Sequence, residues 1–170
     1  MPLSGAMLAV SAFGELTQAL DLGTGKAAQS LSRSMSLSSG TGAGKADRIF
    51  SDRRTLAASA TEDLDLAGVL LDAFGAAITF ARVKGLIIAA AAGNTNNVVV
   101  GAAASNPWAT LLGATHTLTL RPGAFVAVGT GVADATGYAV TAGTGDLLKV
   151  ANSGAGTSVT YDVHIIGASA

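Results

Sequence analysis

Residues 86–92 read LIIAAAA, an unbroken apolar run of strand length that lies between Gly85 and Gly93. Because no polar position interrupts the run, a strand here has both faces buried, and we predict the central strand of a sheet. The polar residues 94–97 that follow predict a turn, and the apolar residues 98–100 predict that the chain returns to the sheet. Together these segments predict a β-hairpin.

Alternating polarity predicts further strands on both sides of this run. Residues 158–166 are the clearest case, because valine, tyrosine and isoleucine hold the odd positions and polar residues hold most of the even ones. In residues 30–38 serine holds every even position, which predicts a strand with one hydroxyl-lined face. Residues 115–120 alternate in the same way. Residues 69–84 fit either a tight turn or a short helix that ends near Lys84.

These patterns amount to about eight to ten short strands separated by Gly, Asn or Pro turns, with little helix. We therefore predict an all-β fold, an antiparallel sandwich or jelly roll. The residues expected in its core are Leu86, Ile87, Ile88, Val99, Leu118, Val126, Val150, Val159, Tyr161, Val163 and Ile165.

The length of 170 residues fits one domain that buries roughly 70% of the surface of its unfolded chain. We place this single β-sandwich domain at residues 15–170. Residues 1–14 are apolar but lack the turn and strand signals of the later chain. They predict a flexible N-terminal arm that orders on a neighbouring molecule, or else a frayed terminus.

Charge is distributed unevenly along the chain. The net charge is −1, and only five charged residues follow Gly85. Since a soluble monomer usually carries a more charged surface, we predict that this half is either covered by Thr, Ser, Asn and Gly or packed against other copies in a homo-oligomer, with the homo-oligomer favoured. Without a clustered basic surface we expect no nucleic-acid partner, and without an apolar run of about 20 residues we expect no membrane partner.

No segment matches a motif for catalysis or for binding a cofactor. The sequence GTGAGKA at residues 40–46 departs from a phosphate-binding loop, because Ser39 stands where a glycine is required and Ala46 replaces the hydroxyl residue. Asp63 and Asp65 share one strand face but lack a recognisable third ligand, so a solvated face is favoured over a calcium site. Cysteine is absent. We predict no enzyme, no cofactor, and no catalytic or metal-binding residue.

Two regions are candidates for contacts with a partner. Residues 47–54 are the most charged part of the chain and predict an exposed edge segment or an intersubunit contact. The sole tryptophan fits either the core or an interface anchor, with the core favoured. The candidate contact residues are Arg48, Phe50, Arg53, Arg54 and Trp108.

Four segments, which cover most of residues 45–167, resemble small virion structural proteins of tailed bacteriophages. They are KADRIFSDRRTLAASATEDLDLAG, FARVKGLIIAAAAGNTNNVVVGAA, LRPGAF and GYAVTAGTGDLLKVANSGAGTSVTYDVHIIG. The resemblance implies a capsid decoration or cement protein, with a trimer as the favoured oligomer, that assembles in the host cytoplasm and resides in the virion. Its implied partner is the major capsid protein or another virion protein.

The alternative from another class is a tail-associated or receptor-facing binding module. In that case the loops rich in Thr, Asn and Gly contact a glycan or a host surface. Sugar sites usually stack aromatic rings on the ligand, and the plausible rings are limited to Trp108, Tyr138 and Tyr161. The scarcity of aromatic residues counts against this alternative.

Overall fold

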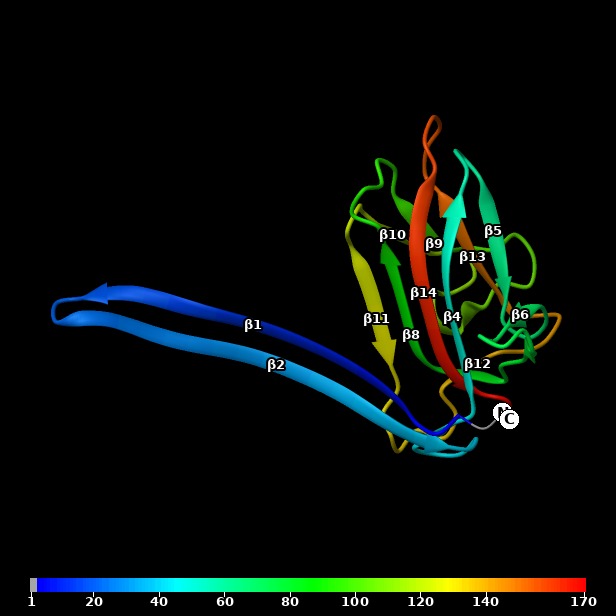
Figure 1. Ribbon diagram of the computed structural model, residues 1–170, viewed down its shortest axis with the longest axis horizontal. Coiled ribbons are helices and arrows are strands. Elements are labelled where there is room, and N and C mark those ends of the chain that lie inside the picture. The colour runs from blue at the N-terminus through cyan, green and yellow to red at the C-terminus, as the bar shows by residue number, and fades with distance from the viewer. Residues whose placement is uncertain (1–2) are drawn as a thin grey trace.

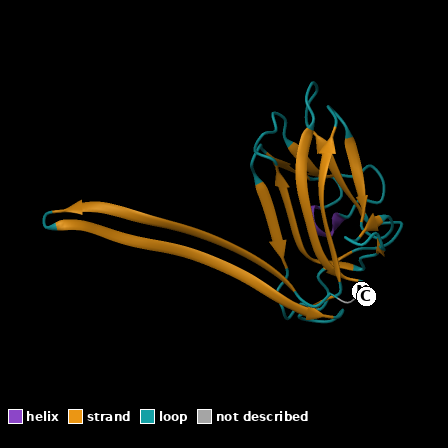
Figure 2. Cartoon of the chain, in the orientation of Figure 1, coloured by secondary structure: helices purple, strands orange, loops and turns teal. Residues whose placement is uncertain are grey.

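The computed structural model describes residues 3–170 and is almost entirely β (Figure 1 and Figure 2). Strands hold 57% of the residues and helix 2%, so the all-β prediction is confirmed. The single helical turn is α1 (Ala109–Leu112). Two sheets form a body, and a long ribbon of two strands projects away from it.

The two sheets of the body are antiparallel and pack face to face. The sheet nearer the ribbon, here the arm-side sheet, has the order β11 (Phe125–Gly129), β8 (Arg82–Ala90), β14 (Val159–Ala168), β4 (Arg48–Leu56). A short strand, β12 (Tyr138–Ala139), also pairs with β8. The far sheet has the order β10 (Thr117–Leu120), β9 (Val98–Gly101), β13 (Leu147–Asn152), β5 (Thr61–Asp65).

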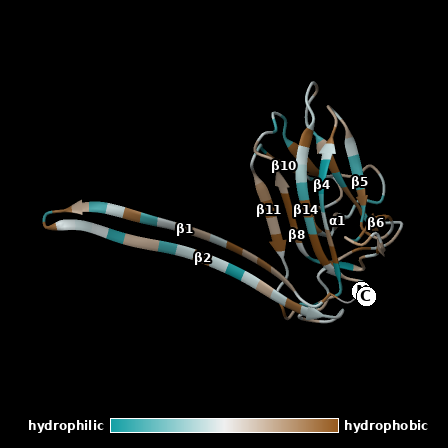
Figure 3. Cartoon of the chain, in the orientation of Figure 1, coloured by the Kyte–Doolittle hydropathy of each residue, from teal (hydrophilic) through white to brown (hydrophobic). Residues whose placement is uncertain are grey.

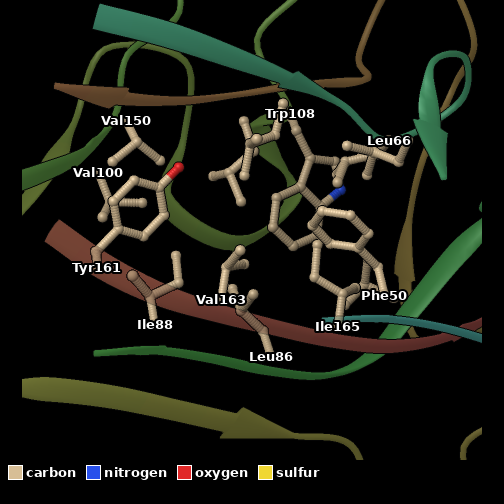
Figure 4. Packing of buried hydrophobic residues seen from close by; sticks show 14 of the residues in the cluster. Phe50, Leu66, Leu86, Ile88, Val100, Trp108, Val150, Tyr161, Val163 and Ile165 are labelled. Carbon is tan, nitrogen blue, oxygen red and sulfur yellow. The ribbon is translucent and has the colours of Figure 1, made fainter. Parts of the chain in front are cut away.

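The main core lies between these sheets (Figure 4). Seven of the residues expected in the core are buried: Leu86, Ile88, Val150, Val159, Tyr161, Val163 and Ile165. Leu118 and Val126 are half-buried because they lie on the edge strands β10 and β11. Ile87 and Val99 were predicted wrongly, since successive strand residues point to opposite faces and these two point outward.

The predicted hairpin at residues 86–100 is wrong. Strands β8 and β9 belong to different sheets, so the chain crosses from one sheet to the other at residues 91–97. Asn94 explains this path, because its side-chain amide accepts from the backbone N–H of Thr160 and donates to the carbonyl of the same residue. Asn96 likewise donates to the carbonyls of Gly154 and Thr157.

Residues 69–84 contain a turn rather than a helix. Strands β6 (Leu70–Leu71) and β7 (Ala77–Ile78) pair with each other. Between them the carboxylate of Asp72 accepts hydrogen bonds of 2.9 Å from the backbone N–H groups of Phe74 and Ala76. These bonds hold the pKa of Asp72 below its usual range, and they satisfy backbone groups that a tight turn leaves without partners.

The projecting ribbon, here the arm, consists of β1 (Ala6–Leu20) and β2 (Gly23–Ser39). The two strands are antiparallel along their whole length, from the pair Ala6–Leu37 to the pair Leu20–Gly23. The strand predicted at residues 30–38 is confirmed as part of β2. The boundary predicted after Gly14 falls inside β1, where we had expected no strand. A short parallel pairing of β2 with β3 (Lys45–Ala46) leads into the body.

Candidate interaction surface

The residues considered for chemistry do not form a common site. Across residues 3–170 no group of three or more His, Asp and Glu side chains is placed to hold a metal ion. Asp63 lies opposite Lys149 on the neighbouring strand, and the carboxylate of Asp65 accepts the backbone N–H of Ala67. His116 precedes β10 in the far sheet, whereas His164 lies on β14 in the arm-side sheet.

Two of the candidate contact residues, Phe50 and Trp108, are buried inside the chain, which corrects the prediction that they contact a partner. Phe50 and Trp108 each expose only 4% of their surface. The indole N–H of Trp108 donates a hydrogen bond of 2.9 Å to the carbonyl of Ala139, and its ring meets Tyr138 edge to face. Trp108 is therefore a core residue, the option that the sequence favoured.

The three candidate arginines each bind a carboxylate of the same chain. Arg53 forms two hydrogen bonds to Asp162, of 2.6 and 2.8 Å. Arg48 donates to the neighbouring Asp47 at 3.1 Å. These pairs neutralise much of the positive charge in β4. The hydrogen bond from Arg53 also holds the pKa of Asp162 below its usual value.

Arg54 lies closer to the core than Arg53 does. Its guanidinium donates to Glu62 at 2.7 Å and to Asp52 at 2.8 Å. The hydrogen bond to Glu62 raises the pKa of Arg54 above its usual value. Since only a third of the Arg54 side chain is exposed, this group joins two strands more than it presents charge to a partner.

Most of the exposed large hydrophobic residues lie on the arm, which carries none of the candidate contact residues. Hydrophobic residues occur along both of its strands (Figure 3). The exposed fractions are 74% for Phe13, 67% for Leu16, 59% for Leu20 and 57% for Leu31. Large contiguous apolar patches are rare on monomeric proteins and mark interaction sites.

The register of the arm divides its side chains between two unlike faces, because directly paired residues lie on the same face. We call one of them the apolar face, and it carries the pairs Leu8–Met35, Val10–Arg33, Ala12–Leu31 and Leu16–Ala27. The opposite face, here the serine face, carries the pairs Met7–Ser36, Ala9–Ser34, Ser11–Ser32 and Phe13–Ser30.

The apolar face meets the body at the root of the arm. Leu8, Met35 and Leu37 are buried in a second cluster with Ala46 and Ile166. Two glycines of the arm-side sheet permit this approach. A Cβ on Gly85 would overlap the end of Met35, and a Cβ on Gly129 would crowd Leu8.

A buried lysine ties the loop after the arm to the body. Lys84 in β8 is fully buried, and its ammonium donates a hydrogen bond to the carbonyl of Gly42. Burial lowers the pKa of Lys84, because it disfavours the charged form. The loop at residues 40–46, whose sequence resembles a phosphate-binding loop, thus uses one of its carbonyls to hold this cation.

Beyond the root the arm and the body diverge, and a groove of about 430 Å³ lies between them. Val10, Ala12 and Leu31 of the apolar face form one wall, and Ala127 and Gly129 of β11 form the other. Beyond Leu8 every residue of β1 is exposed, and an isolated two-stranded ribbon is only marginally stable in water. Both the arm and the outer face of the sheet beside it are therefore candidates for contact with another molecule.

None of the helices among residues 3–170 has the length and apolar character needed to cross a membrane.

Comparison with known proteins found no relative of this chain. No family model matches the chain, and neither the curated proteins nor the solved structures contain a match.

Proposed function

We propose that this chain is a non-enzymatic structural protein of a bacteriophage virion, a decoration or cement protein that binds the head shell in many copies. The sequence resemblance over residues 45–167 supports this function. The structural observation that carries it is the arm, which extends far from a body that has its own core.

The arm offers two means of binding to another protein. Its apolar side chains gain free energy when a partner removes them from water. Its outer strand edges carry backbone N–H and C=O groups that can pair with a further strand. A decoration protein needs contacts of this kind, because it has to join neighbouring subunits of a shell without covalent bonds.

The partner that fits is the major capsid protein or another virion protein, with further copies of this chain beside it. Charge-poor surface on the C-terminal half, where only five charged residues follow Gly85, supports packing among copies. The number three for these copies comes from the resemblance.

The glycan-binding alternative receives less support from the positions of the aromatic rings. Trp108 and Tyr161 are buried in the core, so neither ring can stack on a sugar at the surface. The loops at residues 91–97 and 152–158 bind each other through Thr95, Asn96 and Thr157. Their polar groups are partly occupied within the chain.

The test is to measure copy number and attachment on purified particles. Quantitative mass spectrometry should find hundreds of copies per particle, whereas about twelve or fewer would indicate a tail position and overturn the proposal. A short-arm variant should fold but fail to bind particles that lack the protein. In this variant Asn-Gly replaces residues 10–33 and joins Ala9 to Ser34, which are directly paired. The root residues Leu8 and Met35 remain.

A matched control is Arg53→Ser, which alters an exposed ion pair of the body and leaves the arm intact. We expect this variant to bind particles nearly as well as the unaltered chain, because exposed pairs contribute little. Binding of the short-arm variant at full strength would show that the arm is not the attachment element.

A further inference from the structure

We propose that the apolar face of the arm covers the outer face of the arm-side sheet in a second copy of this chain. The inference goes beyond the proposed function, because the contact joins two copies and does not require a particle. Four observations carry it: the packing at the root, the surfaces that continue from it, their complementary side chains, and the area available.

The contact already exists within one chain at the root of the arm. There Leu8 and Met35 of the apolar face lie against the outer face of the arm-side sheet. The approach is close because Gly85 and Gly129 present no side chain, so that Met35 and Leu8 occupy the space that a Cβ would need. The two surfaces are thus suited to each other where they meet.

The same two surfaces continue past the root but separate from each other. The apolar face continues through Val10, Leu31, Leu16 and Leu20, which expose from 38% to 67% of their surface. The outer face of the sheet continues through three aligned residues, Ala127 on β11, Ile87 on β8 and His164 on β14. The groove between arm and body is lined by both.

The side chains of the two surfaces differ in size in a complementary way. The arm presents leucines, whereas the sheet presents Ala89, Ala127 and Ser51 beside Ile87 and His164, with Phe125 on the edge strand. The small residues leave space beside Ile87 into which leucines can pack, and we call this surface of the sheet the bed. Since the arm bends away from its own bed, the bed that it can cover belongs to another copy.

The area favours a closed, reciprocal arrangement. Eleven residues of a strand at about 3.3 Å each, in a ribbon about 10 Å wide, give an arm face of roughly 360 Å² beyond the root. A stable interface needs about 800 Å² per partner, so one arm on one bed is not enough. When every copy both gives an arm and receives one, the buried surface per copy doubles and approaches this value.

The first test is sedimentation of the full chain over a range of concentrations, without particles. We expect a concentration-dependent oligomer. Leu16→Ser together with Leu31→Ser should raise its dissociation constant at least about tenfold, because two leucine contacts are lost. Phe13→Ser is the matched control, since Phe13 is more exposed than either leucine but lies on the serine face. It should leave the dissociation constant unchanged.

The second test uses the absence of cysteine from the chain. One preparation carries Leu16→Cys on the arm and the other carries Ala89→Cys on the bed, and the two are mixed under mild oxidation. We expect a disulfide between them, and much less of it when Phe13→Cys replaces Leu16→Cys. Each variant is first compared with the unaltered chain by circular dichroism and thermal unfolding.

Three outcomes would overturn the inference. The first is a chain that stays monomeric at every concentration, including one that binds particles through its apolar face. The second is an oligomer that is unaffected by the two leucine substitutions. The third is equal crosslinking from Leu16→Cys and Phe13→Cys. Because neither test contains a particle, these outcomes are separate from a failure of the proposed function.

Discussion

The phenolic hydroxyl of Tyr161 donates a hydrogen bond of 2.8 Å to a carboxylate oxygen of Glu62, and this bond connects β14 of one sheet to β5 of the other. The second oxygen of Glu62 accepts from Arg54 on β4. The pKa of Tyr161 is raised far above its usual value, mainly by burial and secondly by the hydrogen bond to Glu62. Three strands from both sheets are thus linked through one carboxylate at the edge of the core.

Replacing Tyr161 by Phe should lower the free energy of unfolding by about 1.5–3 kcal/mol, because a buried hydrogen bond to a charged group is lost while the ring remains. Urea denaturation measures this difference. Tyr138→Phe is the control, since no hydrogen bond of the Tyr138 hydroxyl is present among residues 3–170. Equal stability of the Tyr161→Phe variant and the unaltered chain would contradict the role of this link.

Truncating Ile88 to Ala should cost about 2–5 kcal/mol, since Ile88 is completely buried and its removal leaves a cavity between the sheets. The neighbouring residue supplies the control. Ile87 is half-buried on the opposite face of β8, so Ile87→Ala should cost less than half as much. Thermal and urea unfolding of both variants give the comparison. Equal costs would mean that the sheet is not packed on one face as described.

Gly167→Ala should destabilise the body by about 1–3 kcal/mol or more through overpacking. A Cβ at this position would overlap the carbonyl oxygen of Arg82 and the ring of Phe80, and a backbone oxygen cannot move aside as a flexible side chain can. Gly93→Ala is a suitable control, because a Cβ at Gly93 meets nothing nearby. A melting temperature of Gly167→Ala that equals that of the control would refute this account.

Protonation of His164 should weaken the fold. Burial lowers the pKa of His164 below its ordinary value near 6.5. Between the two pKa values the unfolded chain therefore binds more protons than the folded one, and stability falls as the pH falls. The stability that neutral His164 contributes is fully present above about pH 6.5, the pKa of histidine in the unfolded chain. It is lost as the pH drops through the lower pKa that His164 has in the folded chain. Unfolding free energies from pH 7.5 to 4.5, in steps of about half a unit, would show this loss.

His164→Gln should remove this part of the pH dependence, since glutamine does not titrate in this range. The control is His116→Gln, which changes an exposed histidine before β10. We expect the His116→Gln variant to keep the slope of the unaltered chain. If the slope persists in His164→Gln, another group is responsible for it.

The strands of the body could be predicted where the two faces of a strand meet different surroundings. Residues 158–166 alternate clearly, and they form most of β14, whose inner side chains fill the core. The crossover at residues 91–97 could not be distinguished from a hairpin. Its direction depends on hydrogen bonds that Asn94 makes to Thr160 in β14 and that Asn96 makes to Gly154 in the loop before β14.

Charge was a poor guide to the surface along β4. Phe50, Asp52 and Arg54 share one face of this strand, since they pair with Ile165, Val163 and Tyr161 of β14. That face points inward, but β4 is an edge strand, so charged groups can lie at the rim beside a buried ring. A charged segment therefore led us to place Phe50 at the surface when it belongs to the core.

The arm was the least predictable part of the candidate surface. Neither face of β1 is covered beyond Leu8, so large apolar residues occur on both faces and no clear alternation results. The turn at Asp21 and Leu22 also lacks the Asn-Gly or Asp-Gly pair that usually signals a hairpin. The sequence indicated that the N-terminus was apolar and that residues 30–38 form a strand, but it did not indicate that the two segments pair.

The length of the arm gives it the geometry of a lever. Twelve residues of β1 follow Leu8, and at about 3.3 Å per residue they reach roughly 40 Å from a fulcrum formed by Leu8, Met35 and Leu37. A rotation of about 7° at that fulcrum moves the tip by roughly 5 Å, close to the spacing of two paired strands. A chain built in this way can bring the tip of its arm to slightly different positions through small adjustments of three side chains, while the packing of its body stays unchanged.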